Sequence, residues 1–186
     1  TPARMDEYTQ VADDIGSGPV GGEGDAYADL VEHVVRPLIA EHYGEPAVVG
    51  TLGSSLGGLI SLHIGLTYPG SYDFVGSMSS TLGWGSIGAS TGETMIERYQ
   101  AAPLQPFTVY LDSGGDGPCV DSDSDGIDDD SGTDNYCETA QMLGVLEGKG
   151  WTEGDTLFYV HDPGAPHNEQ AWAGRVDVPL GIFAAM

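Results

Sequence analysis

The sequence has very few basic residues. Five lysines and arginines stand against 29 aspartates and glutamates, so the formal net charge is −24. Proteins that bind nucleic acid use basic side chains to displace counterions from phosphates, and anionic lipid surfaces attract the same side chains. The composition therefore excludes a nucleic-acid partner and argues against binding to an anionic membrane.

Long apolar runs and a leader are also missing. No apolar run reaches the roughly 18 residues that a membrane-spanning helix needs. The chain begins Thr-Pro-Ala-Arg, without an initiator methionine and without a positive-then-apolar leader. We therefore predict no membrane span, and we interpret the chain as a mature form or a fragment.

Cysteine is limited to Cys119 and Cys137, which flank the most acidic part of the chain. In an oxidising compartment these two thiols would close a loop, which contributes about 3 kcal/mol in the chain-entropy model. The alternative is a pair of reduced thiols in a cytosolic protein. We favour the disulfide, and with it a secreted or periplasmic location.

The residues that are present indicate one globular α/β domain over 1–186. The 186 residues are 40% hydrophobic, which is enough for a compact core and argues against disorder. Short apolar strands alternate with helical patterns, as in a mostly parallel sheet covered by helices on both faces. The expected strands are 47–52, 74–78, 107–111 and 156–160. The expected helices are 25–39, bent near its end by Pro37, then 57–68, 135–146 with Asp134 as its N-cap, and 168–176. Residues 1–24 are expected to be irregular.

The segment Gly53-Ser54-Ser55-Leu56-Gly57 fits the pattern G-x-S-x-G. It lies between a hydrophobic strand and a buried helix, which is the setting of a nucleophile elbow. Such a turn strains the central serine and lifts its hydroxyl above the sheet, so Ser55 is the predicted nucleophile. The backbone N–H of Leu56 would then face the oxyanion. The alternative is a Gly/Ser-rich turn without chemistry.

A serine nucleophile needs a base, and in this fold the histidine follows the serine and the acid along the chain. His33, His42 and His63 come too early. His161 continues the last strand, whereas His167 lies in the loop after it, at the carboxyl edge of the sheet where ligand sites gather. We predict His167 as the base.

The acid is expected after the strand 107–111, where Asp112 and Asp116 are candidates. The turn at Gly114 and Gly115 would let Asp116 fold back toward the imidazole, while Asp112 would brace the turn. We predict Asp116, with Asp112 as the alternative and an acid further along the chain left open.

The Asp-rich stretch contains a pattern typical of calcium loops. Carboxylates at alternate positions converge on one ion, and a following glycine permits the sharp turn. The glutamate that would complete an EF-hand is missing, and the run instead resembles the loops of thrombospondin type-3 repeats. All-oxygen ligation selects calcium. The predicted structural Ca²⁺ ligands are Asp121, Asp123, Asp125, the carbonyl of Ile127, and Asp130, with Asp129 and Asp134 as alternatives to Asp130. A solvated acidic loop is the other interpretation.

Several segments together resemble the Putative esterase family of α/β-hydrolases, which includes enterochelin esterases, feruloyl esterases, esterase D and mycolyltransferases. The matching segments are 4–8, 53–58, 68–69, 110–114, and 167–169 with Trp172. The resemblance implies an α/β-hydrolase fold, a Ser–His–acid triad and ester or thioester substrates. It also implies that the first strands and the second oxyanion donor are outside this chain. The Asp-rich insertion departs from the family pattern.

Three hypotheses follow, and the first is favoured. The first is a serine esterase that acts on a small-molecule or carbohydrate-linked ester, with structural calcium and no organic cofactor. The second is an acyltransferase of the mycolyltransferase type. The third is a non-catalytic, calcium-dependent binding module on a hydrolase scaffold.

Overall fold

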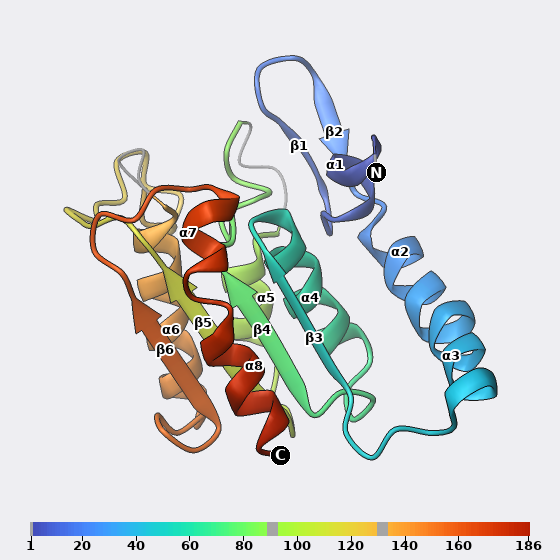
Figure 1. Cartoon of the computed structure of the whole chain (residues 1–186). Coiled ribbons are helices and arrows are strands. Elements are labelled where there is room, and N and C mark those ends of the chain that lie inside the picture. The colour runs from blue at the N-terminus through green and yellow to red at the C-terminus, as the bar shows by residue number, and fades with distance from the viewer. Residues whose placement is uncertain (1, 89–92, 130–133) are drawn as a thin grey trace.

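A computed structural model of the chain describes residues 2–88, 93–129 and 134–186. Its centre is a parallel sheet of four strands in the order β3-β4-β5-β6, as Figure 1 shows. The strands are β3 (Gly50–Ser54), β4 (Phe74–Met78), β5 (Thr108–Ser113) and β6 (Leu157–His161). The predicted α/β class and parallel sheet are confirmed. The bounds of β4 are those predicted, and the other three strands begin and end one to three residues later.

Helices cover both faces of this sheet (Figure 1). Because successive parallel strands are neighbours, their right-handed crossovers place the connecting helices on one face. These helices are α4 (Leu56–Thr67), α5 (Met95–Ala101) and α6 (Tyr136–Lys149). The other face is covered by α7 (Glu169–Ala173) and α8 (Asp177–Ala184), where one helix over 168–176 was predicted. The core therefore forms two layers, one on each side of the strands.

The N-terminal segment contains more regular structure than predicted. It forms α1 (Arg4–Glu7) and an antiparallel pair of short strands, β1 (Ala12–Asp14) and β2 (Pro19–Gly21). Buried Asp13 accepts hydrogen bonds from the backbone N–H groups of Gly85, Ile87 and Gly88. These bonds hold the β1–β2 hairpin against the loop that follows β4.

The predicted helix over 25–39 is a continuous run of three elements: α2 (Gly24–Leu30), the π-helical turn η1 (Val31–Val35) and α3 (Arg36–Tyr43). The irregular part of the helix is thus the π-helical turn before Pro37. The proline ring itself fits in the first turn of α3, where proline is tolerated. Six apolar residues of this run are at least 40% exposed, namely Leu30, Val34, Val35, Leu38, Ile39 and Tyr43. The run lies beside the outer edge of β3 (Figure 1). That the first strands of the fold are outside this chain stays a prediction.

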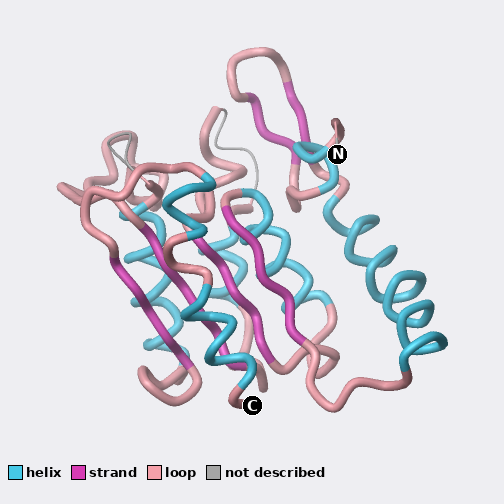
Figure 2. The backbone as a smooth tube through the Cα atoms, in the orientation of Figure 1, coloured by secondary structure: helices cyan, strands magenta, loops and turns pink. Residues whose placement is uncertain are grey.

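The loops that follow the carboxyl ends of the strands gather at one end of the sheet, as Figure 2 shows. One of them is closed by a disulfide between Cys119 and Cys137, with Cα atoms 5.3 Å apart, so the predicted disulfide is confirmed. It joins the Asp-rich loop to the first turn of α6. In the described part of the chain, no helix is long and apolar enough to cross a membrane.

Candidate active site

Ser55 lies at the sharp turn between β3 and α4. Its backbone has φ 56° and ψ −128°, a conformation that is costly for a residue with a side chain. The turn is held from both sides: the Ser55 N–H donates to the Met78 carbonyl at 2.8 Å, and the Ser55 carbonyl accepts from Gly58 and Leu59. The structure therefore contains the strained strand–turn–helix that the sequence pattern predicted.

Two glycines make this turn possible. A Cβ at Gly53 would collide with the backbone of Gly57, and one at Gly58 would collide with the Ser80 hydroxyl and approach the Gly53 carbonyl to 2.9 Å. By contrast, a Cβ at Gly57 meets no described heavy atom within 4 Å. The helix can cross close to the strand because Gly53 and Gly58 lack side chains. The absence of a side chain at Gly57 therefore has no part in this close approach.

His167 faces the Ser55 hydroxyl from the loop between β6 and α7. Its Nε2 lies 3.0 Å from the Ser55 Oγ, and its side chain is 33% exposed. The imidazole and the Trp172 ring pack in a T-shaped arrangement, with ring centroids 4.9 Å apart. The side chain of Asn168 caps α7 by accepting from the Ala171 N–H. The cap and the aromatic contact fix the ring over the serine.

The carboxylate against the imidazole is that of Asp134. Its Oδ1 lies 2.7 Å from the Nδ1 of His167, and the Asp134 side chain is fully buried. The sequence interpretation assigned this place to Asp116, which is exposed, and made Asp134 a helix cap. Both predictions are corrected: Asn135 occupies the N-cap position of α6, in a left-handed conformation. The side chains of Ser55, His167 and Asp134 thus form one chain of close polar contacts.

Asp134 is surrounded by donors that favour its ionised form. Burial by itself would raise the pKa of Asp134, but contacts with His167, with the Ser79 hydroxyl and with the Gly114 N–H hold the pKa below its ordinary value. The two last donors reach Oδ2 at 2.5 Å and 2.7 Å. The carboxylate is therefore a permanent anion behind the imidazole at neutral pH.

The Asp-rich insertion explains why the sequence misplaced the acid. Asp134 lies 20 residues after Gly114, yet the hydrogen bond between them brings it to the end of β5, where the acid was expected. The disulfide ties Cys119 to Cys137, three residues beyond Asp134. The predicted pairing of the two cysteines was the signal that the far end of the insertion returns to this strand.

Asp112, the alternative acid, belongs to a buried charge cluster with Arg175. Its Oδ1 lies 3.1 Å from the Nη2 of Arg175, and its Oδ2 accepts from the Tyr110 hydroxyl at 3.0 Å. Burial, together with the nearby charge of Asp134, raises the pKa of Asp112, against the opposing effects of Arg175 and Tyr110. The sequence reasoning missed Arg175, which carried no motif.

The backbone N–H of Leu56 occupies the first position of α4. The first N–H groups of a helix have no intrahelical acceptor, and the helix dipole adds positive potential there. Leu56 immediately follows Ser55, so its N–H is placed beside the serine hydroxyl. Its role as oxyanion donor stays a prediction.

The Asp-rich loop brings three predicted metal ligands together. Carboxylate oxygens of Asp121, Asp123 and Asp125 lie within 4.8 Å of one another, and this group is able to hold a metal ion. The turn is fixed because the N–H groups of Asp125 and Gly126 donate to Asp121. Gly126 has φ 92°, as the calcium-loop pattern requires.

The remaining predicted calcium ligands differ in where they lie and what they contact. The side chain of Ile127 is buried in the core and anchors the loop. Asp129 accepts from the Ser122 N–H, which helps to lower its pKa. The carboxylate of Asp134 contacts His167 and not the three aspartates of the Asp-rich loop. Asp130 lies outside the described residues.

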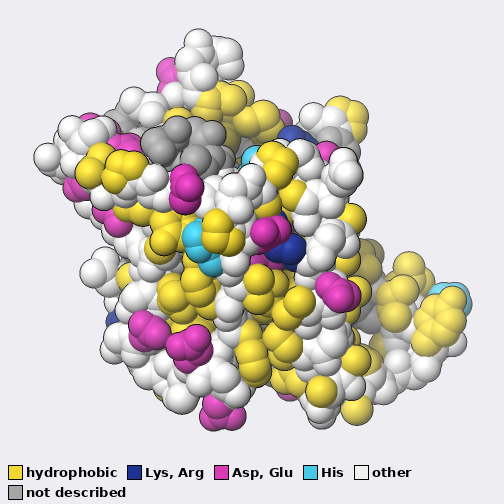
Figure 3. All heavy atoms as spheres, turned by 60° about the vertical axis from the view of Figure 1, so that its left-hand side comes forward, with side chains coloured by type: hydrophobic (Ala, Val, Ile, Leu, Met, Phe, Trp, Pro, Cys, Tyr) yellow, Lys and Arg dark blue, Asp and Glu magenta, His cyan; other side chains and the backbone are white. Residues whose placement is uncertain are grey.

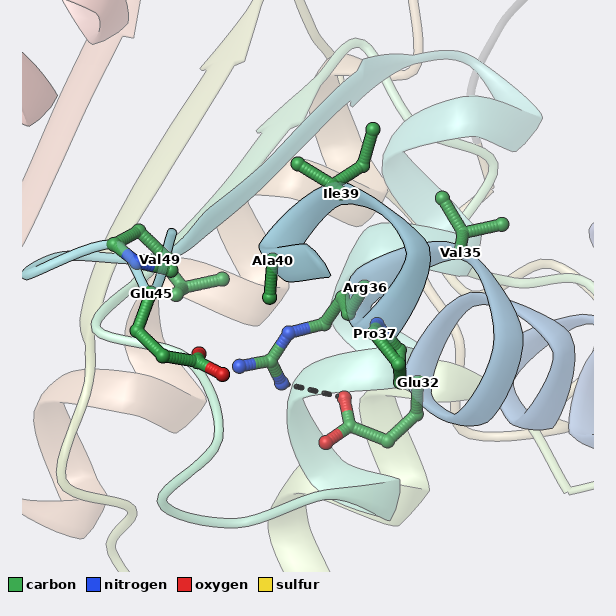
Figure 4. A pocket seen from close by; sticks show the side chains of 9 residues that line it. Glu32, Val35, Arg36, Pro37, Ile39, Ala40, Glu45 and Val49 are labelled. Carbon is green, nitrogen blue, oxygen red and sulfur yellow. Dashed lines mark hydrogen bonds and ion pairs between the residues drawn. The ribbon is translucent and has the colours of Figure 1, made fainter. Parts of the chain in front are cut away.

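A separate cavity of about 340 Å³ lies between α3 and the segment that enters β3. Figure 4 shows Arg36 at its centre, paired with Glu32 at 2.6 Å, beneath the apolar side chains of Val35, Ile39 and Val49. The residues that line it include none of the predicted catalytic or metal-binding residues. We therefore assign it no part in the chemistry around Ser55.

Comparisons with known proteins identify the family of this chain. A family model described as Putative esterase matches residues 4–179. The protein YbbA of Bacillus subtilis is 29% identical over 178 residues, covering 90% of this chain and 64% of the relative. The siderophore triacetylfusarinine C esterase of Aspergillus fumigatus is 33% identical over 72 residues, covering 37% of this chain and 25% of the relative.

The fold is shared with solved structures of α/β-hydrolases. The enterobactin esterase FES from Shigella flexneri superposes with a TM-score of 0.66 at 17% identity, covering 87% of this chain and 38% of that chain. At this identity the likeness concerns the fold alone. The chain thus spans less than two thirds of the length of these relatives.

Proposed function

This chain belongs to the Putative esterase family, and we propose that it hydrolyses carboxylic esters through an acyl-enzyme on Ser55. The observation that carries the proposal is the chain of contacts from Ser55 Oγ to His167 Nε2, at 3.0 Å, and from His167 Nδ1 to Asp134, at 2.7 Å. A serine hydroxyl, an imidazole and a buried carboxylate in this order are the parts of a nucleophilic triad.

In the first step His167 removes the proton from the Ser55 hydroxyl as the oxygen attacks the acyl carbon. A bond forms between Oγ and that carbon, and the carbonyl oxygen becomes an oxyanion beside the Leu56 N–H. The C–O bond to the alcohol then breaks, and the imidazolium gives its proton to the leaving oxygen. Water repeats the sequence to release the acid and regenerate Ser55.

Asp134 supports both steps without exchanging a proton. Its carboxylate holds the His167 Nδ1–H, so that Nε2 keeps its lone pair toward Ser55, and it stabilises the imidazolium that forms. The low pKa of Asp134 keeps it ionised throughout. The strained backbone of Ser55 fixes the hydroxyl, so little reorganisation precedes attack.

The esters that we propose first are siderophore esters. The support is that a curated relative is named a siderophore triacetylfusarinine C esterase and a structural neighbour an enterobactin esterase. Carbohydrate-linked esters are the second class of substrate to be tested.

We further propose a secreted or periplasmic location and a structural calcium ion. The disulfide supports the location. Asp121, Asp123 and Asp125 would hold the ion, which would neutralise their mutual repulsion and fix the loop. The loop ends near Asp134, so an ordered loop also supports the site.

The experiment that tests the proposed function is turnover of an ester panel by wild-type protein and Ser55→Ala. We expect hydrolysis of at least one siderophore or sugar ester, lost in the variant, with free acid as the product. Transfer of the acyl group to an added alcohol would indicate the acyltransferase alternative. Turnover that persists in Ser55→Ala, or no turnover of any ester, would contradict the proposal.

A further inference from the structure

We propose that Arg175 is a positioning residue for the Ser55–His167–Asp134 chain: its guanidinium holds Asp134 against His167 and balances the charge of Asp112. The inference rests on the proposed function, because it concerns how the acid of that triad is held. Arg175 contacts none of the reacting atoms, so its effect would act through Asp134.

The first observation is that Arg175 lies between two fully buried carboxylates. Its Nη2 lies 3.1 Å from Asp112, 3.2 Å from Asp134 and 2.9 Å from the Ser79 hydroxyl. The arginine side chain is 6% exposed, and both carboxylates are 0% exposed. One cation thus serves two buried anions through a single nitrogen atom.

The second observation is the division of labour between the two oxygens of Asp134. Oδ1 faces the Nδ1 of His167 at 2.7 Å. Oδ2 accepts from the Ser79 hydroxyl and the Gly114 N–H, and contacts Arg175. The donors on Oδ2 fix the plane of the carboxylate, which leaves Oδ1 directed at the imidazole.

Two carboxylates so close together need a cation beside them. Two carboxylates in one buried site cannot both stay ionised without an opposite charge, because repulsion and desolvation favour protonation of one of them. A proton on Asp134 would remove the anion behind His167. The Arg175 guanidinium, in contact with both carboxylates, offsets the repulsion between them and so helps to keep Asp134 available as an acceptor for His167.

The other charged and titratable groups around the cluster are few. Asp162, on the loop that carries His167, lies 3.6 Å from Arg175 Nη1 and is 52% exposed, so water screens it. Tyr110 donates to Asp112. Asp177 acts on Tyr110 and Tyr159 faces Asp112, both at longer range. These groups leave Arg175 as the cation that contacts both buried carboxylates.

The fold places Arg175 in the link between α7 and α8. The N–H groups of Arg175 and Val176 both donate to the Trp172 carbonyl, at 3.0 Å. Trp172 in turn packs against His167. The same short segment thus holds the imidazole from one side and the acid from the other.

The test compares the pH profile of kcat/KM, on any ester that wild-type protein hydrolyses, for Arg175→Gln and Arg175→Lys. Glutamine removes the positive charge, whereas lysine keeps it. We expect Arg175→Gln to shift the acid limb of the profile upward by about one pH unit, which is about a tenfold loss on that limb. We expect Arg175→Lys to keep the wild-type limb.

A double variant removes the second carboxylate charge as well. In Arg175→Gln/Asp112→Asn one positive and one negative charge are lost together, so the acid limb should return to its wild-type position. The double variant also tests the proposal if Arg175→Gln alone does not fold. Its buried cluster keeps the net charge that the cluster has in the wild-type protein. Arg36→Met, which breaks a partly exposed ion pair between η1 and α3, is the control that should leave the acid limb unmoved.

The outcomes separate the two proposals. Equal losses at every pH in Arg175→Gln, or a double variant whose limb is displaced from wild type, would overturn the positioning role while Ser55-dependent turnover stands. Turnover by wild-type protein that is indifferent to Ser55→Ala would instead overturn the proposed function. A limb that moves with the charge at position 175 supports the inference.

Discussion

At the scale of single residues, the contact with the imidazole of His167 shows which aspartate lies behind the base, a choice that the sequence left open. Asp134 lies 2.7 Å from it, while Asp116 is exposed on the loop after β5. The pattern around Ser55 and the late loop of His167 were sufficient to predict that these side chains meet, since a strand–turn–helix signal is local. The acid was not predictable in this way, because Asp134 lies 20 positions after Gly114, beyond the Asp-rich insertion.

Asp134→Asn should therefore lower kcat/KM by roughly a hundredfold to ten-thousandfold. The amide cannot stabilise the imidazolium and favours the wrong tautomer of His167. Steady-state ester hydrolysis measures the effect, and Asp116→Asn is the matched control, because it removes one carboxylate charge at an exposed position. An unchanged rate in Asp134→Asn, or an equal loss in Asp116→Asn, would contradict the role of Asp134 and favour Asp116 as the acid.

At the scale of elements, the sequence predicted best where a segment is long or uniformly buried. β4 is buried at every position, and its bounds were those expected. β1 and β2 have three residues each, too few for a periodic pattern, so the hairpin was missed. The divided helix at the C-terminus and the π-turn before Pro37 depend on tertiary packing and backbone geometry that periodicity does not encode.

The crossing of α4 over β3 gives a prediction with an internal control. Gly58→Ala should lower the free energy of unfolding by about 1–3 kcal/mol, because its Cβ collides with Ser80 and crowds the Gly53 carbonyl. Gly57→Ala, one residue earlier, should change it by about 0.5–1 kcal/mol in the stabilising direction. Urea denaturation measures both. Similar values for the two variants would contradict the close approach.

At the scale of the whole molecule, charge is the dominant feature. On the face shown in Figure 3, acidic side chains are spread over the surface and basic ones are sparse. Composition predicted this surface, and alternation of strands and helices predicted the layered sheet. Composition did not reveal that one of the five basic residues, Arg175, is buried at the site, since burial of a single arginine depends on the partners that the fold brings to it.

The acidic loop also bears on the stability of the whole chain. Calcium should raise the free energy of unfolding, by about 2.7 kcal/mol at a concentration of 100 times its Kd. Thermal denaturation with calcium and with a chelator measures this, and Asp121→Asn/Asp123→Asn should abolish the increase. Glu153→Gln/Asp155→Asn, which removes two exposed acids elsewhere, should retain it. A calcium effect that is equal in both double variants would indicate general screening instead of a bound ion.

The central claim is that Ser55 is activated by His167. The most direct measurement is tandem mass spectrometry of the protein after reaction with a fluorophosphonate, which traps an activated serine. We predict one adduct, on Ser55 and not on the neighbouring Ser54, formed by wild-type protein and lost in His167→Ala. An adduct on another residue, or labelling of Ser55 at the same rate in His167→Ala, would contradict it.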